Sequence, residues 1–143
     1  MTDGLRVGAE SVTGACLCGA LRYRVRLPAR WVAHCHCSYC RRAHGAAFVT
    51  WVGLSREDFE LLQADTLCWY ASSAEARRGF CARCGATCLF ESGHWPDETH
   101  VTLASLDSDA GLQPQAHAYW SSRASWTAAQ DDGLPRVDPP DHA

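Results

Sequence analysis

The sequence predicts an all-β fold of antiparallel strands with short helical turns, stabilised by zinc bound to cysteines. Three observations lead to this prediction. Short runs with strand-like patterns recur along the 143 residues, turn residues separate them, and no long stretch shows helical periodicity. In addition, seven of the nine cysteines fall in closely spaced groups, which is typical of metal sites.

The first third of the chain combines turns with short strands. Residues 1–13 show no strand pattern, and we expect residues 1–11 to be a flexible leader before one zinc-binding domain of residues 12–136. Glycine and cysteine at 14–19 predict a tight turn. Between residues 21 and 27, apolar side chains alternate with arginines, which predicts a half-buried strand. Its inward-facing side chains are Leu21, Tyr23, Val25 and Leu27.

A metal-binding turn is expected next. Residues 32–36 read as a short extended segment, residues 37–40 as a cysteine knuckle, and residues 41–44 as a helical turn that continues it. Residues 48–54 are apolar and β-rich, which predicts a strand. The capping-box pattern that begins at Ser55 then predicts one further helical turn, to Asp58.

The second half of the chain is predicted to be strands followed by an aromatic segment. Five stretches have the composition and length of ordinary strands: 59–62, 66–70, 77–80, 87–91 and 99–106. Beyond Gly111, we expect Tyr119, Trp120 and Trp126 to dock on the sheet. Residues 137–143 are rich in Asp and Pro and are expected to form a flexible tail.

Composition and charge argue against several classes of protein. The formal net charge is −3 and no basic extension is present, so we expect no binding to nucleic acid. No apolar run approaches the roughly 18 residues of a membrane span. The first fifteen residues also lack the apolar core of a secretory signal. We therefore expect a cytoplasmic protein whose cysteines stay reduced.

Cysteine spacing is the strongest functional signal. The count of nine is odd, which disfavours a disulfide scaffold. Seven cysteines make four motifs, two of which share Cys37: Cys16-Leu-Cys18, Cys35-His-Cys37, Cys37-Ser-Tyr-Cys40 and Cys81-Ala-Arg-Cys84. A C-x-x-C turn presents two sulfurs to one tetrahedral ion at about 2.3 Å. Because seven thiolates exceed the four that one zinc ion accepts, we expect two zinc ions per chain, bound by four and by three cysteines.

The simplest assignment follows from proximity along the chain. Cys35, Cys37 and Cys40 lie within six residues and can surround one ion. That ion keeps an open position for water or a substrate atom, as in catalytic zinc sites. The remaining four cysteines then form a closed structural site that links the start of the domain to its later half: Cys16, Cys18, Cys81 and Cys84.

Three alternatives stay open at this stage. The two C-x-x-C turns could share one structural ion as a zinc ribbon, although three cysteines then have no role. A redox-active C-x-x-C would need a β-α-β setting, which the sequence lacks. Finally, Cys68 or Cys88, otherwise interpreted as small core residues on strands, could close the three-cysteine site. The protein would then be a non-catalytic, zinc-stabilised binding module.

Polar side chains near the three-cysteine motif are candidates for other roles. His34 and His44 flank the motif and could hydrogen-bond to the ligands or exchange protons there. His36 alternates with two proposed ligands along an extended segment, so it should point away from them. Arg41 and Arg42 directly follow the motif and could hold a substrate carboxylate through paired hydrogen bonds.

Several spaced motifs taken together resemble one family. They are Gly14-Ala-Cys-Leu-Cys-Gly-Ala-Leu-Arg-Tyr23, Cys35-His-Cys-Ser-Tyr-Cys-Arg-Arg-Ala-His-Gly45, Phe80-Cys-Ala-Arg-Cys-Gly85, Leu103-Ala-Ser-Leu-Asp107, and a closing segment with Tyr119-Trp120, Trp126 and Asp132-Gly-Leu-Pro135. In this order, over residues 12–136, they resemble the glutathione-dependent formaldehyde-activating enzymes, a family that includes centromere protein V-like proteins.

This resemblance implies a β-tent of antiparallel sheets and the same division of the cysteines into a structural and an open zinc site. It also implies a carbon–sulfur lyase-type enzyme that joins glutathione and formaldehyde into S-hydroxymethylglutathione. Coordination to zinc deprotonates a thiol. We therefore expect a substrate thiolate to complete the open shell and attack a small aldehyde, giving a hemithioacetal.

Overall fold

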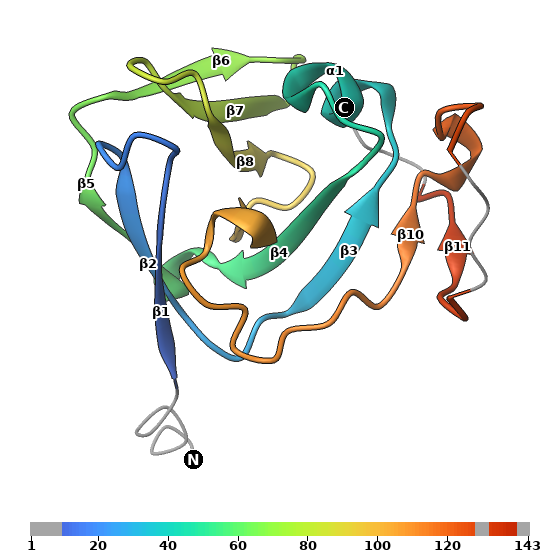
Figure 1. The fold of residues 1–143 in the computed structure, drawn as a ribbon, viewed down its shortest axis with the longest axis horizontal. Helices are drawn as coiled ribbons and strands as arrows, with labels where there is room; N and C mark the ends of the chain where they lie inside the picture. The colour runs from blue at the N-terminus through green and yellow to red at the C-terminus, as the bar shows by residue number, and fades with distance from the viewer. Residues whose placement is uncertain (1–9, 128–131, 140–143) are drawn as a thin grey trace.

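The computed structural model describes residues 10–127 and 132–139, and β-strands are their main regular secondary structure, as predicted (Figure 1). The strands are β1 (Ser11–Ala15), β2 (Arg22–Arg26), β3 (Trp31–Cys35), β4 (Val49–Ser55), β5 (Phe59–Gln63), β6 (Leu67–Ala71), β7 (Ala76–Cys81), β8 (Thr87–Ser92), β9 (Glu98–Thr102), β10 (His117–Ala118) and β11 (Arg136–Val137). The helical segments are α1 (Ser38–His44) and three 3-10 turns, η1 (Arg56–Asp58), η2 (Leu103–Ser105) and η3 (Trp120–Ser122). Among the described residues, no helix is both long and apolar enough to cross a membrane.

The strands form two sheets. The smaller sheet has the order β1-β2-β5, and the larger has the order β11-β10-β3-β4-β9-β8-β7-β6. Neighbouring strands run antiparallel, except that β10 is parallel to both β3 and β11. Helix α1 follows β3 directly and lies close to β7, a strand that comes much later in the sequence (Figure 1).

Two strand predictions need correction. Strand β1 begins at Ser11, whereas the sequence predicted no strand before Leu21. Gly14 weakens the strand signal because glycine is uncommon in strand interiors. The position nevertheless requires glycine, because a Cβ there would overlap the ring of Tyr23. The strand expected over 99–106 ends at Thr102 and gives way to a 3-10 turn. Within that turn, the Ser105 hydroxyl donates to the Thr102 carbonyl, a local bond that competes with strand pairing.

The C-terminal segment also differs from expectation. The two-residue strands β10 and β11 are too short to leave a periodic signal, and the sequence analysis missed both. Val137, expected at the start of the flexible tail, pairs with Ala118. The remainder of the predicted tail lies partly outside the described residues, as does most of the predicted leader.

The main core lies between the two sheets. Leu21, Tyr23 and Val25, predicted to face inward, are fully buried there. They pack in one cluster with apolar side chains of the larger sheet, including Val52 and Leu89. Burial of each such side chain contributes roughly 1.5–3 kcal/mol. This packing leaves the opposite face of the larger sheet available for a second cluster, which contains the cysteines next to α1.

That opposite face carries one row of side chains across five strands. In the strand register, Arg78 on β7 is opposite Phe90 on β8, and Phe90 is opposite His100 on β9. The row continues through Gly53 on β4 to Trp31 on β3. Directly paired residues share a face of the sheet, so register alone aligns these side chains. Arg78, Phe90 and His100 from this row line the site described below.

Candidate metal centres

The four cysteines assigned to a closed site lie together. The Sγ atoms of Cys16, Cys18, Cys81 and Cys84 are all within 4.8 Å of one another. The Cys16–Cys18 and Cys18–Cys81 sulfur pairs are 3.7 and 3.8 Å apart. Four sulfurs held tetrahedrally about 2.3 Å from one ion would be about 3.8 Å apart. The spacing and the all-sulfur donor set therefore fit a zinc ion.

Two glycine turns shape this cluster. Gly19 and Gly85 have φ values of 82° and 79°, a conformation that glycine adopts without strain. The Gly85 turn closes through a 2.7 Å hydrogen bond from its N–H to the Cys81 carbonyl. The hydrogen bond between the Cys81 sulfur and the Thr66 hydroxyl lowers the pKa of Cys81 to about 6, which favours the thiolate that binds metal.

The three cysteines assigned to an open site form a second, buried cluster. Cys35 ends β3, Cys37 is the N-cap of α1, and Cys40 lies in the first turn of that helix. Their sulfurs are within 4.8 Å of one another, and no other described Cys, His, Asp or Glu joins the group. The Cys40 backbone N–H donates to the Cys37 sulfur at 3.3 Å. These three sulfurs also suit zinc and leave one tetrahedral position for another ligand.

A buried cation accompanies this cluster. Arg78, only 5% exposed, places Nη1 at 3.6 Å from the Cys40 sulfur. The indole N–H of Trp51 donates to the same sulfur at 3.3 Å. Hydrogen bonds from Cys35 and Cys37, together with the Arg78 charge, hold the pKa of Cys40 well below its usual range. The protein thus stabilises a thiolate at Cys40, and sequence reasoning gave no sign of Arg78.

The two remaining cysteines do not complete the open cluster. Cys88 is buried in the main core with Cys16 and Cys81, next to the four-cysteine cluster. Cys68 is exposed on β6, so its interpretation as a core residue was wrong. All nine cysteines lie in the described part of the chain and are free thiols. The zinc-ribbon alternative also fails, because its two C-x-x-C turns belong to different clusters.

A small cavity, which we call the inner cavity, adjoins the three-cysteine cluster. Its volume is about 50 Å³. The lining residues are Cys35, Cys37, Cys40, Trp51, Arg78, Phe90, Trp95, His100 and Tyr119. Tyr119 has φ of 56°, a left-handed conformation that is costly outside glycine. Sequence analysis assigned only a packing role to Tyr119 and overlooked His100.

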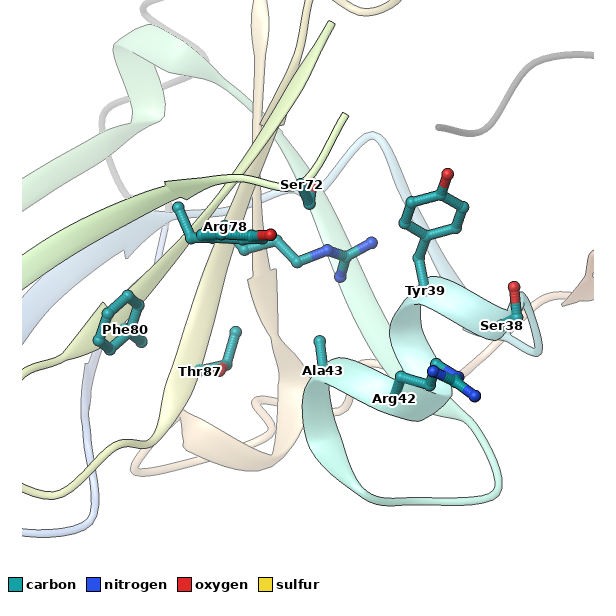
Figure 2. Close-up of a pocket in the computed structure, with 9 residues that line it drawn as sticks. Ser38, Tyr39, Arg42, Ala43, Ser72, Arg78, Phe80 and Thr87 are labelled. Carbon is teal, nitrogen blue, oxygen red and sulfur yellow. The ribbon is translucent and has the colours of Figure 1, made fainter. Parts of the chain in front are cut away.

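A larger opening, the outer groove, lies between α1 and strands β6–β8. Its volume is about 720 Å³ (Figure 2). It is lined by Ser38, Tyr39, Arg42, Ala43, Tyr70, Ser72, Arg78, Phe80 and Thr87. Figure 2 shows the Arg78 side chain reaching from β7 toward α1. Arg78 borders both the groove and the inner cavity. Of the two arginines named from the sequence, Arg42 lines the groove and Arg41 does not.

The flanking histidines occupy different environments. His44 packs edge-on against Trp51, with ring centroids 5.5 Å apart, and its pKa is lowered by burial. His34 does not line the inner cavity. It instead donates or accepts a 2.8 Å hydrogen bond with Thr50 and faces a separate pocket of about 240 Å³. The expectation that His34 borders the open site is therefore corrected, because it alternates with Cys35 along β3.

His36 points into that separate pocket as well, as the alternation predicted. Its Nε2 lies 2.9 Å from Nδ1 of His117, and Nε2 of His117 lies 2.7 Å from an Asp132 carboxylate oxygen. The hydrogen bond from His117 lowers the pKa of Asp132, so the carboxylate accepts. This series of hydrogen bonds fixes which nitrogen donates at each step, and it connects the segment containing Asp132 to the residue between Cys35 and Cys37.

Comparisons of sequence and structure relate this chain to known proteins. A sequence model of the family described as glutathione-dependent formaldehyde-activating enzyme matches residues 11–122. A relative from Halomonas elongata, named "Putative glutathione-dependent formaldehyde-activating enzyme", is 27% identical over 128 residues, which cover 79% of this chain and 77% of the relative. A crystal structure of a Rhodobacter sphaeroides protein superposes with a TM-score of 0.57 at 25% identity, covering 87% of this chain and 98% of that one.

Proposed function

The chain belongs to the glutathione-dependent formaldehyde-activating enzyme family, and on this premise we propose that it is a zinc-dependent enzyme of the carbon–sulfur lyase type. The proposed reaction joins a thiol such as glutathione to a small aldehyde such as formaldehyde, giving S-hydroxymethylglutathione. The observation that carries the proposal is a three-sulfur cluster at a cavity that meets a substrate-sized groove at Arg78.

We propose two zinc ions per chain, one with a structural role and one with a role in the reaction. Cys16, Cys18, Cys81 and Cys84 would hold a structural ion. Cys35, Cys37 and Cys40 would hold the second ion, which when bound lowers the pKa of a substrate thiol and fixes its position. Arg78 and Trp51 offset the negative charge of this cluster through their contacts with Cys40.

The outer groove suits the body of a peptide-like thiol. Its volume of about 720 Å³ falls within the range of about 300–1,000 Å³ typical of small-molecule sites. Glutathione carries two carboxylates, and Arg42 and Arg78 supply positive charge at the groove wall. A thiol bound there would reach the sulfur cluster past Arg78, which borders both spaces.

The inner cavity restricts the aldehyde. Its volume of about 50 Å³ is small beside the 720 Å³ of the outer groove. Aromatic side chains form much of its lining, so the space cannot widen without displacing Trp51, Phe90 or Trp95. A one-carbon aldehyde fits this space best, and larger aldehydes should react slowly.

The proposal is tested by metal content and by catalysis of adduct exchange. We expect two zinc atoms per chain by mass spectrometry, and a change in zinc–sulfur coordination by X-ray absorption when glutathione is added. Two-dimensional exchange NMR of glutathione and formaldehyde should show faster formation of the adduct with the zinc-loaded protein. Cys40→Ser should abolish this acceleration, whereas the exposed Cys68→Ser should retain it. Unchanged coordination and no acceleration would support the non-catalytic binding module instead.

A further inference from the structure

A histidine–glutamate pair forms part of the inner cavity wall. Nε2 of His100 lies 2.8 Å from Oε1 of Glu98. The same carboxylate also accepts from Nε1 of Trp31 at 3.2 Å and from Nη1 of Arg30 at 3.2 Å. Although burial opposes ionisation, the hydrogen bonds from His100 and Arg30 lower the pKa of Glu98. Glu98 is therefore a fixed, charged acceptor behind the imidazole.

This arrangement selects one tautomer of His100. A carboxylate only accepts hydrogen bonds, so Nε2 of His100 carries the ring proton. When the imidazole is neutral, its other nitrogen, Nδ1, is the atom that can accept a proton. His100 lines the inner cavity and Glu98 does not. The pair thus has the geometry in which a buried carboxylate orients an imidazole for proton transfer.

The sheet register places His100 in the wall of the inner cavity, in line with Phe90 and Arg78. His100 stacks on Phe90, with centroids 5.5 Å apart and planes inclined by 26°. Arg78 covers the same Phe90 ring, its Cζ lying 4.9 Å from the centroid. Of the residues that line the inner cavity, His100 is the one imidazole and none is a carboxylate. Because a guanidinium stays protonated in proteins, Arg78 does not substitute for a proton acceptor there.

We propose that His100, oriented by Glu98, carries the proton in the thiol–aldehyde reaction; this inference rests on the function proposed above. The S–H bond breaks and its proton moves to Nδ1 of His100. The sulfur electron pair forms the S–C bond while the C=O π pair moves onto oxygen, and that oxygen then takes the proton from His100. The reaction involves no net oxidation or reduction, and the same steps in reverse cleave the adduct. Glu98 is a positioning residue in this scheme.

The first test compares two histidine variants of the zinc-loaded protein. His100→Gln keeps an N–H that Glu98 can accept but cannot carry the proton. We expect adduct formation to slow by about 100-fold or more, the usual effect of removing a general acid–base group. Zinc content and the glutathione Kd from calorimetry should stay unchanged. The control is His94→Gln, because His94 is exposed and outside the inner cavity, and it should keep the wild-type rate.

A second measurement does not depend on turnover. Long-range ¹H–¹⁵N NMR spectra should show His100 protonated at Nε2 in the wild type. In Glu98→Gln, the amide can donate to Nε2, so the proton should shift to Nδ1 and the rate should fall with unchanged glutathione affinity. An Nδ1-protonated wild-type ring, or a His100→Gln rate within about threefold of wild type, overturns the inference. Absence of acceleration by the wild type itself overturns the proposed function, and this inference with it.

Discussion

Substituting one cysteine in each cluster should destabilise the protein to very different extents. The Cys18 and Cys81 sulfurs are 3.8 Å apart across 63 residues. For a cross-link of that span, chain entropy predicts a stabilisation of about 4 kcal/mol. The three-cysteine cluster closes a loop of only six residues. For a loop of that length, the same relation predicts a stabilisation of about 2 kcal/mol. Cys81→Ser should therefore lose more stability than Cys40→Ser.

Calorimetric melts of the zinc-loaded variants measure this difference. At roughly 2–4 °C per kcal/mol for a chain of this size, Tm should fall by roughly 8–16 °C in Cys81→Ser and roughly 4–8 °C in Cys40→Ser. Cys68→Ser is the matched control, because Cys68 is exposed and belongs to neither cluster, so its Tm should equal that of the wild type. Equal decreases in Cys81→Ser and Cys40→Ser would refute the division into a structural and an open cluster.

Three further predictions follow from the site. Gly53→Ala should destabilise the protein by about 1–3 kcal/mol in urea titrations, because the new Cβ would overlap the Trp31 indole; an unchanged midpoint would contradict this. Arg78→Met should weaken zinc binding to the three-cysteine cluster by roughly 10–100-fold in chelator competition. The zinc of the four-cysteine cluster should be unaffected, and equal loss from both would show a general defect. Because the pKa of Glu98 is lowered in the fold, its contribution to stability is present above its unfolded pKa and lost as pH falls through the folded value. Glu98→Gln should therefore flatten the acid side of the stability–pH profile, and an unchanged profile would argue against this role.

The two cysteine clusters were predictable because the spacing of their members is a local feature of the sequence. The spacings of Cys35, Cys37 and Cys40, and of Cys81 and Cys84, restrict which sulfurs can meet before any fold is known. The half-buried strand through Tyr23 was also predictable from local sequence, because alternation over a few residues defines its buried face. The same alternation rule, applied consistently, would have placed His34 with His36 and away from the open cluster.

The rest of the site depends on register, which a single sequence does not determine. Arg78, Phe90 and His100 come together because β7, β8 and β9 pair with one particular alignment. A shift of one residue in any of these strands would turn the side chain to the opposite face. Glu98 and His100 are two residues apart and face the same side, but only the pairing of β9 with β4 and β8 brings His100 to the inner cavity, with Glu98 hydrogen-bonded to it.

Strand β7 connects the two clusters mechanically. Cys81, a member of the four-cysteine cluster, ends this strand, and Arg78 lies three residues before it with its guanidinium against Cys40. Anchoring Cys81 therefore also restrains the position of Arg78 and of Phe80, which lines the outer groove. Loss of the structural ion should accordingly perturb the charge beside Cys40 even where the fold survives. We expect Cys84→Ser, which leaves all three sulfurs of the open cluster in place, to weaken glutathione binding as well as lower the Tm. A lowered Tm with unchanged glutathione affinity would show that the β7 connection transmits no strain between the clusters.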